Sequence, residues 1–105
     1  MKLDPRKERE ISEKLAYENS RHTILAMYDF WAGRAGGIGW CINHLNDKAA
    51  LKKEYDGCLQ AKEDSARINA QSCVRYYDGR ADGVRWWLEN FDNLELPEES
   101  TGKEE

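Results

Sequence analysis

The chain has 105 residues, of which 40% are hydrophobic and 34% are charged, so it fits one small domain whose own core is thin. Its formal net charge of −4 excludes a general attraction to nucleic-acid phosphates, and we expect no direct binding to duplex DNA. No run approaches the roughly eighteen apolar residues of a membrane span, and the N-terminus is too charged for a signal peptide. We therefore expect a protein with no membrane contact.

Three cysteines, Cys41, Cys58 and Cys73, are spread along the chain without the CxxC pairs of a zinc site. An odd number at low density does not suit a secreted disulfide framework. The cysteine pattern therefore indicates the reducing cytoplasm, with no structural metal and no cofactor.

The first predicted helix extends from about residue 5 to about residue 45. Asp4 can cap the free amide groups and Pro5 fits the first helical position. Apolar residues then recur at alternating spacings of four and three, and this register passes directly through the glycine-rich stretch 33–39. The members of this seam are Ile24, Tyr28, Trp31, Ala35, Ile38, Ile42 and Leu45.

The second predicted helix extends from about residue 48 to about residue 91, with Asn46 or Asp47 as its cap. Its apolar seam repeats the first one 46 residues later, which indicates an internal duplication of one long helix. The alternative is that any two amphipathic helices share such a pattern. The members of the second seam are Ala70, Val74, Tyr77, Ala81, Val84, Leu88 and Phe91.

Glycines form part of a second seam on the opposite face of each predicted helix. Glycine inside a helix costs about 1 kcal/mol relative to alanine, so we expect Gly33, Gly37, Gly79 and Gly83 to allow close approach of another backbone. A helix with two such faces needs two neighbours. The alternative is that stretch 33–39 is a loop able to cradle a phosphate, although it lacks the strand and lysine of a P-loop.

A flank of small residues in the first helix contrasts with a charged flank in the second, at Asp78, Asp82, Arg85 and Glu89. The small flank predicts that the first helix lies in the middle of a bundle built by two or more chains. The predicted fold is therefore all-α: a long antiparallel helical hairpin that assembles, in coiled-coil fashion, into a homo-oligomeric bundle. The predicted helix-packing residues are Ala32, Gly33, Gly36, Gly37, Gly39, Asn43, Gly79 and Gly83.

Arginines and aromatic residues lie near one another in this pattern and could bind a partner protein or a planar anion such as a nucleotide. The simpler interpretation, which we favour, is that Arg34 and Arg80 pair with Asp29, Asp78 or Asp82 while the aromatic rings fill the seams. The candidate binding residues are Arg34, Arg80, Trp40, Trp86, Trp87, Tyr76 and Tyr77.

No arrangement typical of nucleophilic catalysis is present, and we expect no enzyme activity. Two ExxE-type pairs give the one alternative: they could meet as in the all-α magnesium-dependent nucleotide pyrophosphatases. These carboxylates are Glu10, Glu13, Glu89 and Asp92.

The leading prediction is a non-enzymatic interaction protein, residues 1–96, followed by a disordered acidic tail, 97–105. It would act as a homo-oligomer that binds another protein, as small inhibitors or adaptors of phages and mobile elements do. A nucleotide or cyclic oligonucleotide bound where subunits meet is the second hypothesis, and the hydrolase is the third.

Overall fold

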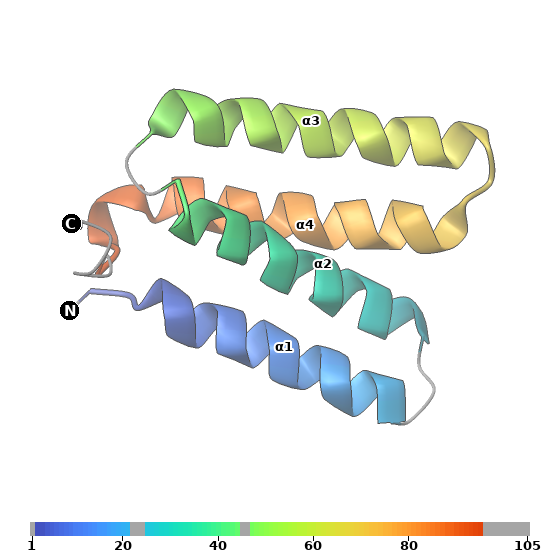
Figure 1. The fold of residues 1–105 in the computed structure, drawn as a ribbon, viewed down its shortest axis with the longest axis horizontal. Coiled ribbons are helices and arrows are strands. Elements are labelled where there is room, and N and C mark those ends of the chain that lie inside the picture. Colours follow the sequence, from blue (N-terminus) through green and yellow to red (C-terminus); the bar gives the residue numbers. More distant parts are fainter. Residues whose placement is uncertain (1, 22–24, 45–46, 96–105) are drawn as a thin grey trace.

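The structure, a computed structural model, describes residues 2–21, 25–44 and 47–95. These residues form four α-helices and one short 3₁₀ helix, so the all-α prediction is confirmed (Figure 1). The predicted acidic tail, 97–105, lies outside the described residues. The helices are α1 (Pro5–Arg21), α2 (Leu25–Ile42), α3 (Lys48–Arg67), α4 (Gln71–Glu89) and η1 (Phe91–Asn93).

The prediction of two long helices, 5–45 and 48–91, is wrong, because each is divided into two. The second division is a turn after α3, in which Asn69 takes a left-handed conformation with φ of 59°. Asparagine tolerates this conformation better than most residues and is a known helix-ending signal. In the first predicted helix, α1 ends at Arg21 and α2 begins at Leu25, and residues 22–24 lie outside the described part of the chain.

Both predicted helix starts are confirmed. The Asp4 carboxylate accepts a hydrogen bond from the amide of Arg6 at 3.0 Å, and α1 begins at the next residue, Pro5. The Asp47 carboxylate accepts one from the amide of Ala50, also at 3.0 Å, and caps α3. Each cap satisfies an amide that the first helical turn leaves without a backbone acceptor.

The two helix pairs α1–α2 and α3–α4 are hairpins that meet through α2 and α4 (Figure 1). The glycine stretch 33–39 is helical, as predicted, and α2 packs against two neighbours, α1 and α4. Those neighbours come from the same chain, because four short helices already supply the partners that two long helices would have needed from other subunits. The bundle is therefore built within one chain.

The prediction of one long antiparallel hairpin needs a further correction, because α2 and α4 run in the same direction. A Cβ atom added to Gly33 would overlap the carbonyl oxygen of Tyr76, and one added to Gly79 would overlap that of Phe30. One added to Gly83 would lie 2.5 Å from the carbonyl oxygen of Arg34. The glycines of both helices therefore form one parallel crossing in which the two backbones touch.

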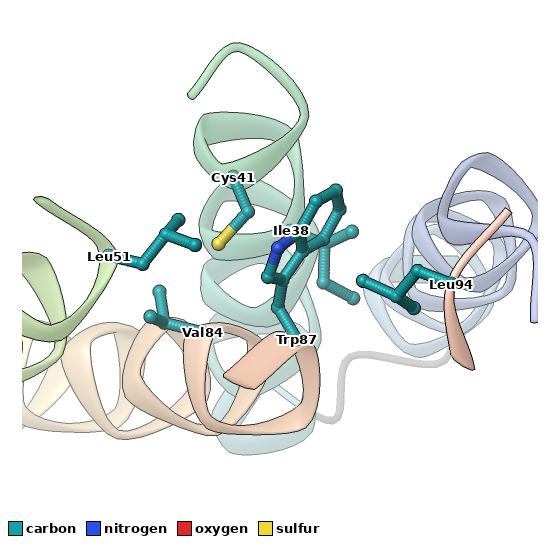
Figure 2. Packing of buried hydrophobic residues seen from close by; sticks show 6 residues of the cluster. All are labelled: Ile38, Cys41, Leu51, Val84, Trp87 and Leu94. Carbon is teal, nitrogen blue, oxygen red and sulfur yellow. The ribbon is translucent and has the colours of Figure 1, made fainter. Parts of the chain in front are cut away.

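The hydrophobic core lies beside this crossing, where side chains from three helices and the segment after η1 converge (Figure 2). Trp87 is its largest member and is fully buried. The Trp87 indole N–H has no acceptor among the described residues. The six members are Ile38, Cys41, Leu51, Val84, Trp87 and Leu94.

The segment before α1 is joined to the segment after η1 by backbone hydrogen bonds. The amide of Leu3 donates to the carbonyl of Asn93 at 2.8 Å, and the amide of Glu95 donates to the carbonyl of Leu3 at 2.6 Å. Within the described residues, none of the helices is both long enough and apolar enough to cross a membrane.

Candidate functional site

Arg34 is the centre of a buried polar network between α1, α2 and α4. Its Nε donates to the carboxylate of Asp82 and its Nη1 to that of Glu8, both at 2.7 Å. The same Nη1 donates to the hydroxyl of Ser12 at 3.0 Å. The Arg34 side chain is 10% exposed, so these partners compensate the loss of its hydration.

The network also controls the ionisation of Asp82. Burial alone would raise the pKa of this carboxyl group, but hydrogen bonds from Arg34 and then Arg85 outweigh it and lower the pKa below 3.8. Asp82 is therefore a carboxylate at neutral pH. The predicted pairing of Arg34 with one of three aspartates is confirmed for Asp82.

Arg80 occupies the corresponding position in α4. Its Nε donates to the carboxylate of Glu54 at 3.0 Å and its Nη1 donates to the hydroxyl of Tyr76 at 3.3 Å. The structure thus gives both candidate arginines partners within the chain. Asp29 and Asp78, their other expected partners, instead bind Arg75 and Lys62, each at 3.0 Å.

The candidate aromatic residues differ in burial and in the rings that they contact. Trp87 is fully buried, so its predicted role as a surface contact is wrong, because the core needs a large side chain at this point. Trp40 stacks on the His44 ring with 3.7 Å between ring centroids, and Tyr76 and Tyr77 pack edge to face. Trp86 is partly buried against the core. The structure does not gather these rings into one surface.

A groove lies on the surface between α1 and α2. It has a volume of about 600 Å³ and its floor is made of small residues, among them Ala32, Gly36 and Gly39. Two tyrosines line it as well: Tyr17, which is 61% exposed, and Tyr28, which is 39% exposed. We call this surface the α1–α2 groove; it is lined by Arg9, Glu13, Ala16, Tyr17, Tyr28, Ala32, Ala35, Gly36 and Gly39.

The corresponding space between α3 and α4 is smaller, about 260 Å³, and charged. Asp82 and Arg85 form an ion pair where the α1–α2 groove has Gly36 and Gly39, which lie 46 residues earlier. One turn away, Lys62 and Asp78 bridge α3 and α4 in place of Ala16 and Ala32 of the first hairpin. Ion pairs therefore occupy one space, and small side chains leave the other open.

All the predicted packing residues except Asn43 fall into two groups. Gly33, Gly37, Gly79 and Gly83 contact the facing backbone in the α2–α4 crossing. Ala32, Gly36 and Gly39 line the α1–α2 groove, and Asn43 is exposed.

Sequence reasoning missed the tyrosines that line the α1–α2 groove. The apolar pattern predicts a place for Tyr28 in the first seam and gives no role to Tyr17. The sequence pattern did not place α1 against α2, because it predicted one continuous helix where α1 ends at Arg21 and α2 begins at Leu25.

The carboxylate cluster of the hydrolase alternative does not form. Among the described residues, no group of three or more His, Cys, Asp or Glu side chains is placed to hold a metal ion. Glu10, Glu13, Glu89 and Asp92 are all exposed.

The buried thiols are suppressed as nucleophiles. Desolvation by burial is the main cause that raises the pKa of Cys41 to about 12 and that of Cys58 to about 11, and the charge of Glu54 adds to both. Cys73 is exposed, and all three cysteines are free thiols.

Comparisons of the chain with models of protein families, with curated proteins and with solved structures found no match.

Proposed function

We propose that this chain is a non-enzymatic interaction protein whose α1–α2 groove is a protein-binding surface. We propose that a second copy of the same chain occupies this groove, so that the chain forms a homo-oligomer. The supporting observation is the contrast between the two hairpins, because the open groove of one corresponds to paired charges in the other. The glycines in the groove floor lower the stability of α2 as a helix. Side chains of a partner that fill the groove would add van der Waals contacts that offset this loss.

A duplication of the whole hairpin explains why the two spaces correspond. The carboxylates that bind Arg34 and Arg80 each lie 26 residues before their arginine, and the two arginines lie 46 residues apart. The glycine contacts of the crossing repeat in the same way: Gly33 meets the carbonyl of Tyr76, and Gly79, 46 residues after Gly33, meets that of Phe30, 46 residues before Tyr76. We infer that the repeated unit is a two-helix hairpin, and that the two copies diverged at the groove positions.

The α1 helix carries the charges that favour a second copy as occupant. Arg9 and Glu13 lie one turn apart on the face of α1 that lines the groove. Two antiparallel α1 helices that meet at this face would place Arg9 of each copy opposite Glu13 of the other. Arg9 and Glu13 both line the groove, and their own contact, at 3.8 Å and substantially exposed, is too weak to hold them together.

A charge-swap experiment tests this arrangement by light scattering coupled to size exclusion. At about 100 μM, where micromolar association is nearly saturated, we expect the wild-type chain to be a dimer or larger. Arg9→Glu and Glu13→Arg should each be monomeric alone, because each places like charges opposite each other. Their mixture should form a heterodimer. A monomeric wild type, or a mixture no larger than its components, would contradict the proposal.

A glycine substitution tests the groove independently of charge. Gly39→Leu fills the floor, and the nearest atom to its new Cβ is the flexible Arg9 side chain at 3.5 Å, so the fold should be retained. Gly57→Leu is the matched control, because a Cβ at Gly57 has nothing within 4 Å. We expect only Gly39→Leu to dissociate the assembly. Equal masses for both variants would rule out the groove as the interface.

A protein of different sequence is the other possible occupant, as an inhibitor or adaptor acting in the cytoplasm would require. Native mass spectrometry of the chain purified from its own cells distinguishes the two occupants. A homo-oligomer supports the second copy, and a hetero-complex lost in Gly39→Leu supports a different partner at the same groove.

A further inference from the structure

A second groove lies at the other hairpin, between the first turns of α3 and the last turns of α4. Its volume is about 550 Å³, within the usual range for small-molecule sites. Lys48, Lys52 and Tyr55 follow one another at spacings of four and three, so they share one face of α3. Arg85, Leu88 and Glu89 of α4 line the other side.

The groove is positively charged in a chain whose net charge is −4. Its lining holds three cations and one carboxylate, Glu89, and Asp82 outside the lining pairs with Arg85, so one net positive charge remains. Two of the cations are held in place. The Lys48 ammonium group lies 4.9 Å from the centroid of the Phe91 ring, and the Arg85 guanidinium is held by Asp82. Cations fixed in this way lose less side-chain entropy when an anion binds.

The rest of the lining is aromatic and apolar. Tyr55 and Leu88 are partly buried and pack against the hydrophobic core, so their positions are fixed by the fold. A phenol ring beside cations suits a ligand that has both a flat ring and a phosphate. Glu89 can accept hydrogen bonds from hydroxyl or amino groups of the same ligand.

We infer that this groove binds a nucleoside phosphate, with its phosphates at Lys48, Lys52 and Arg85 and its base against Tyr55. This site differs from the sequence-based nucleotide hypothesis, which placed the ligand at Arg34 and Arg80. It does not depend on the α1–α2 groove, so it can hold whether or not the chain self-associates.

Isothermal titration with ADP tests the site, with adenosine and pyrophosphate as partial ligands. We expect ADP to bind more tightly than either partial ligand, and Lys52→Glu to weaken ADP binding at least about tenfold. Lys53→Glu is the matched control, because Lys53 is exposed on the same helix and does not line the groove. Tyr55→Leu should weaken ADP binding and leave pyrophosphate binding unchanged.

Three results would overturn the inference. The first is no binding of ADP at about 1 mM. The second is equal weakening by Lys52→Glu and Lys53→Glu, which would indicate diffuse charge attraction rather than a site. The third is pyrophosphate binding as tight as that of ADP, which would remove the aromatic half of the site.

Discussion

Replacing Gly79 by alanine tests the structural basis of the fold most directly. The new methyl group would overlap the main-chain carbonyl of Phe30, and no side-chain rotation can relieve a clash with backbone. The two helices α2 and α4 must therefore separate, which also loosens the contacts at the other crossing glycines. Overpacking of this kind costs about 3 kcal/mol, and alanine recovers about 1 kcal/mol of helix propensity.

The expected net loss for Gly79→Ala is thus about 2 kcal/mol in the free energy of unfolding, or a fall in Tm of roughly 8–16 °C for a domain of this size. Urea unfolding followed by circular dichroism measures it. Gly57→Ala is the control and should be more stable than wild type by up to about 1 kcal/mol, because its methyl group meets open space. If Gly79→Ala proved as stable as wild type, the backbone contact between α2 and α4 would not exist.

Three further outcomes follow from the buried charges and thiols. Arg34→Met should cost about 2–3 kcal/mol because it leaves two partly buried carboxylates without their cation, whereas Arg85→Met should cost less than about 1 kcal/mol; urea unfolding compares them. The lowered pKa of Asp82 adds stability that is complete above its ordinary value of 3.8 and is lost as the pH falls through the lower folded value, so acid titration of stability should be flatter in Arg34→Met. Cys73 should react rapidly with a thiol reagent at pH 8 while Cys41 does not, and the raised pKa of Cys41 predicts that stability declines as the pH rises from 9 towards 12.

The sequence predicted the all-α class, the helical glycine stretch and both helix starts, but not the helix breaks. The spacing of apolar residues carried the helix correctly through the glycines at 33–39, and Asp4 and Asp47 cap the helices as their residue types predict. The sequence did not predict the turn at Asn69. The predicted apolar seam begins at the next residue, Ala70, so no irregularity in its spacing marked the end of a helix. The asparagine itself, a residue type that favours helix ends, was the available signal.

The sequence did not predict which helices pack against each other. Two glycine faces 46 residues apart indicated close packing, but whether they meet depends on how many times the chain reverses between them. With one reversal the equivalent glycines lie on antiparallel helices and cannot meet in register. With two reversals the helices that carry the glycines run parallel, and each glycine can contact the facing helix, as Gly33 contacts α4 and Gly79 contacts α2. The carboxylate partners of Arg34 and Arg80 follow from that topology and not from local pattern.

The hydrogen bonds between Leu3 and the Asn93–Glu95 segment bring the two ends of the described chain together. A circular permutant that joins Leu3 to Glu95 through a short linker, with new ends opened at the exposed Ile68, would keep every helix in its place. In this permutant α3 and α4 are no longer consecutive in the chain, whereas α1 and α2 still are. A slower folding rate than that of the wild type would therefore show that the α3–α4 hairpin forms early.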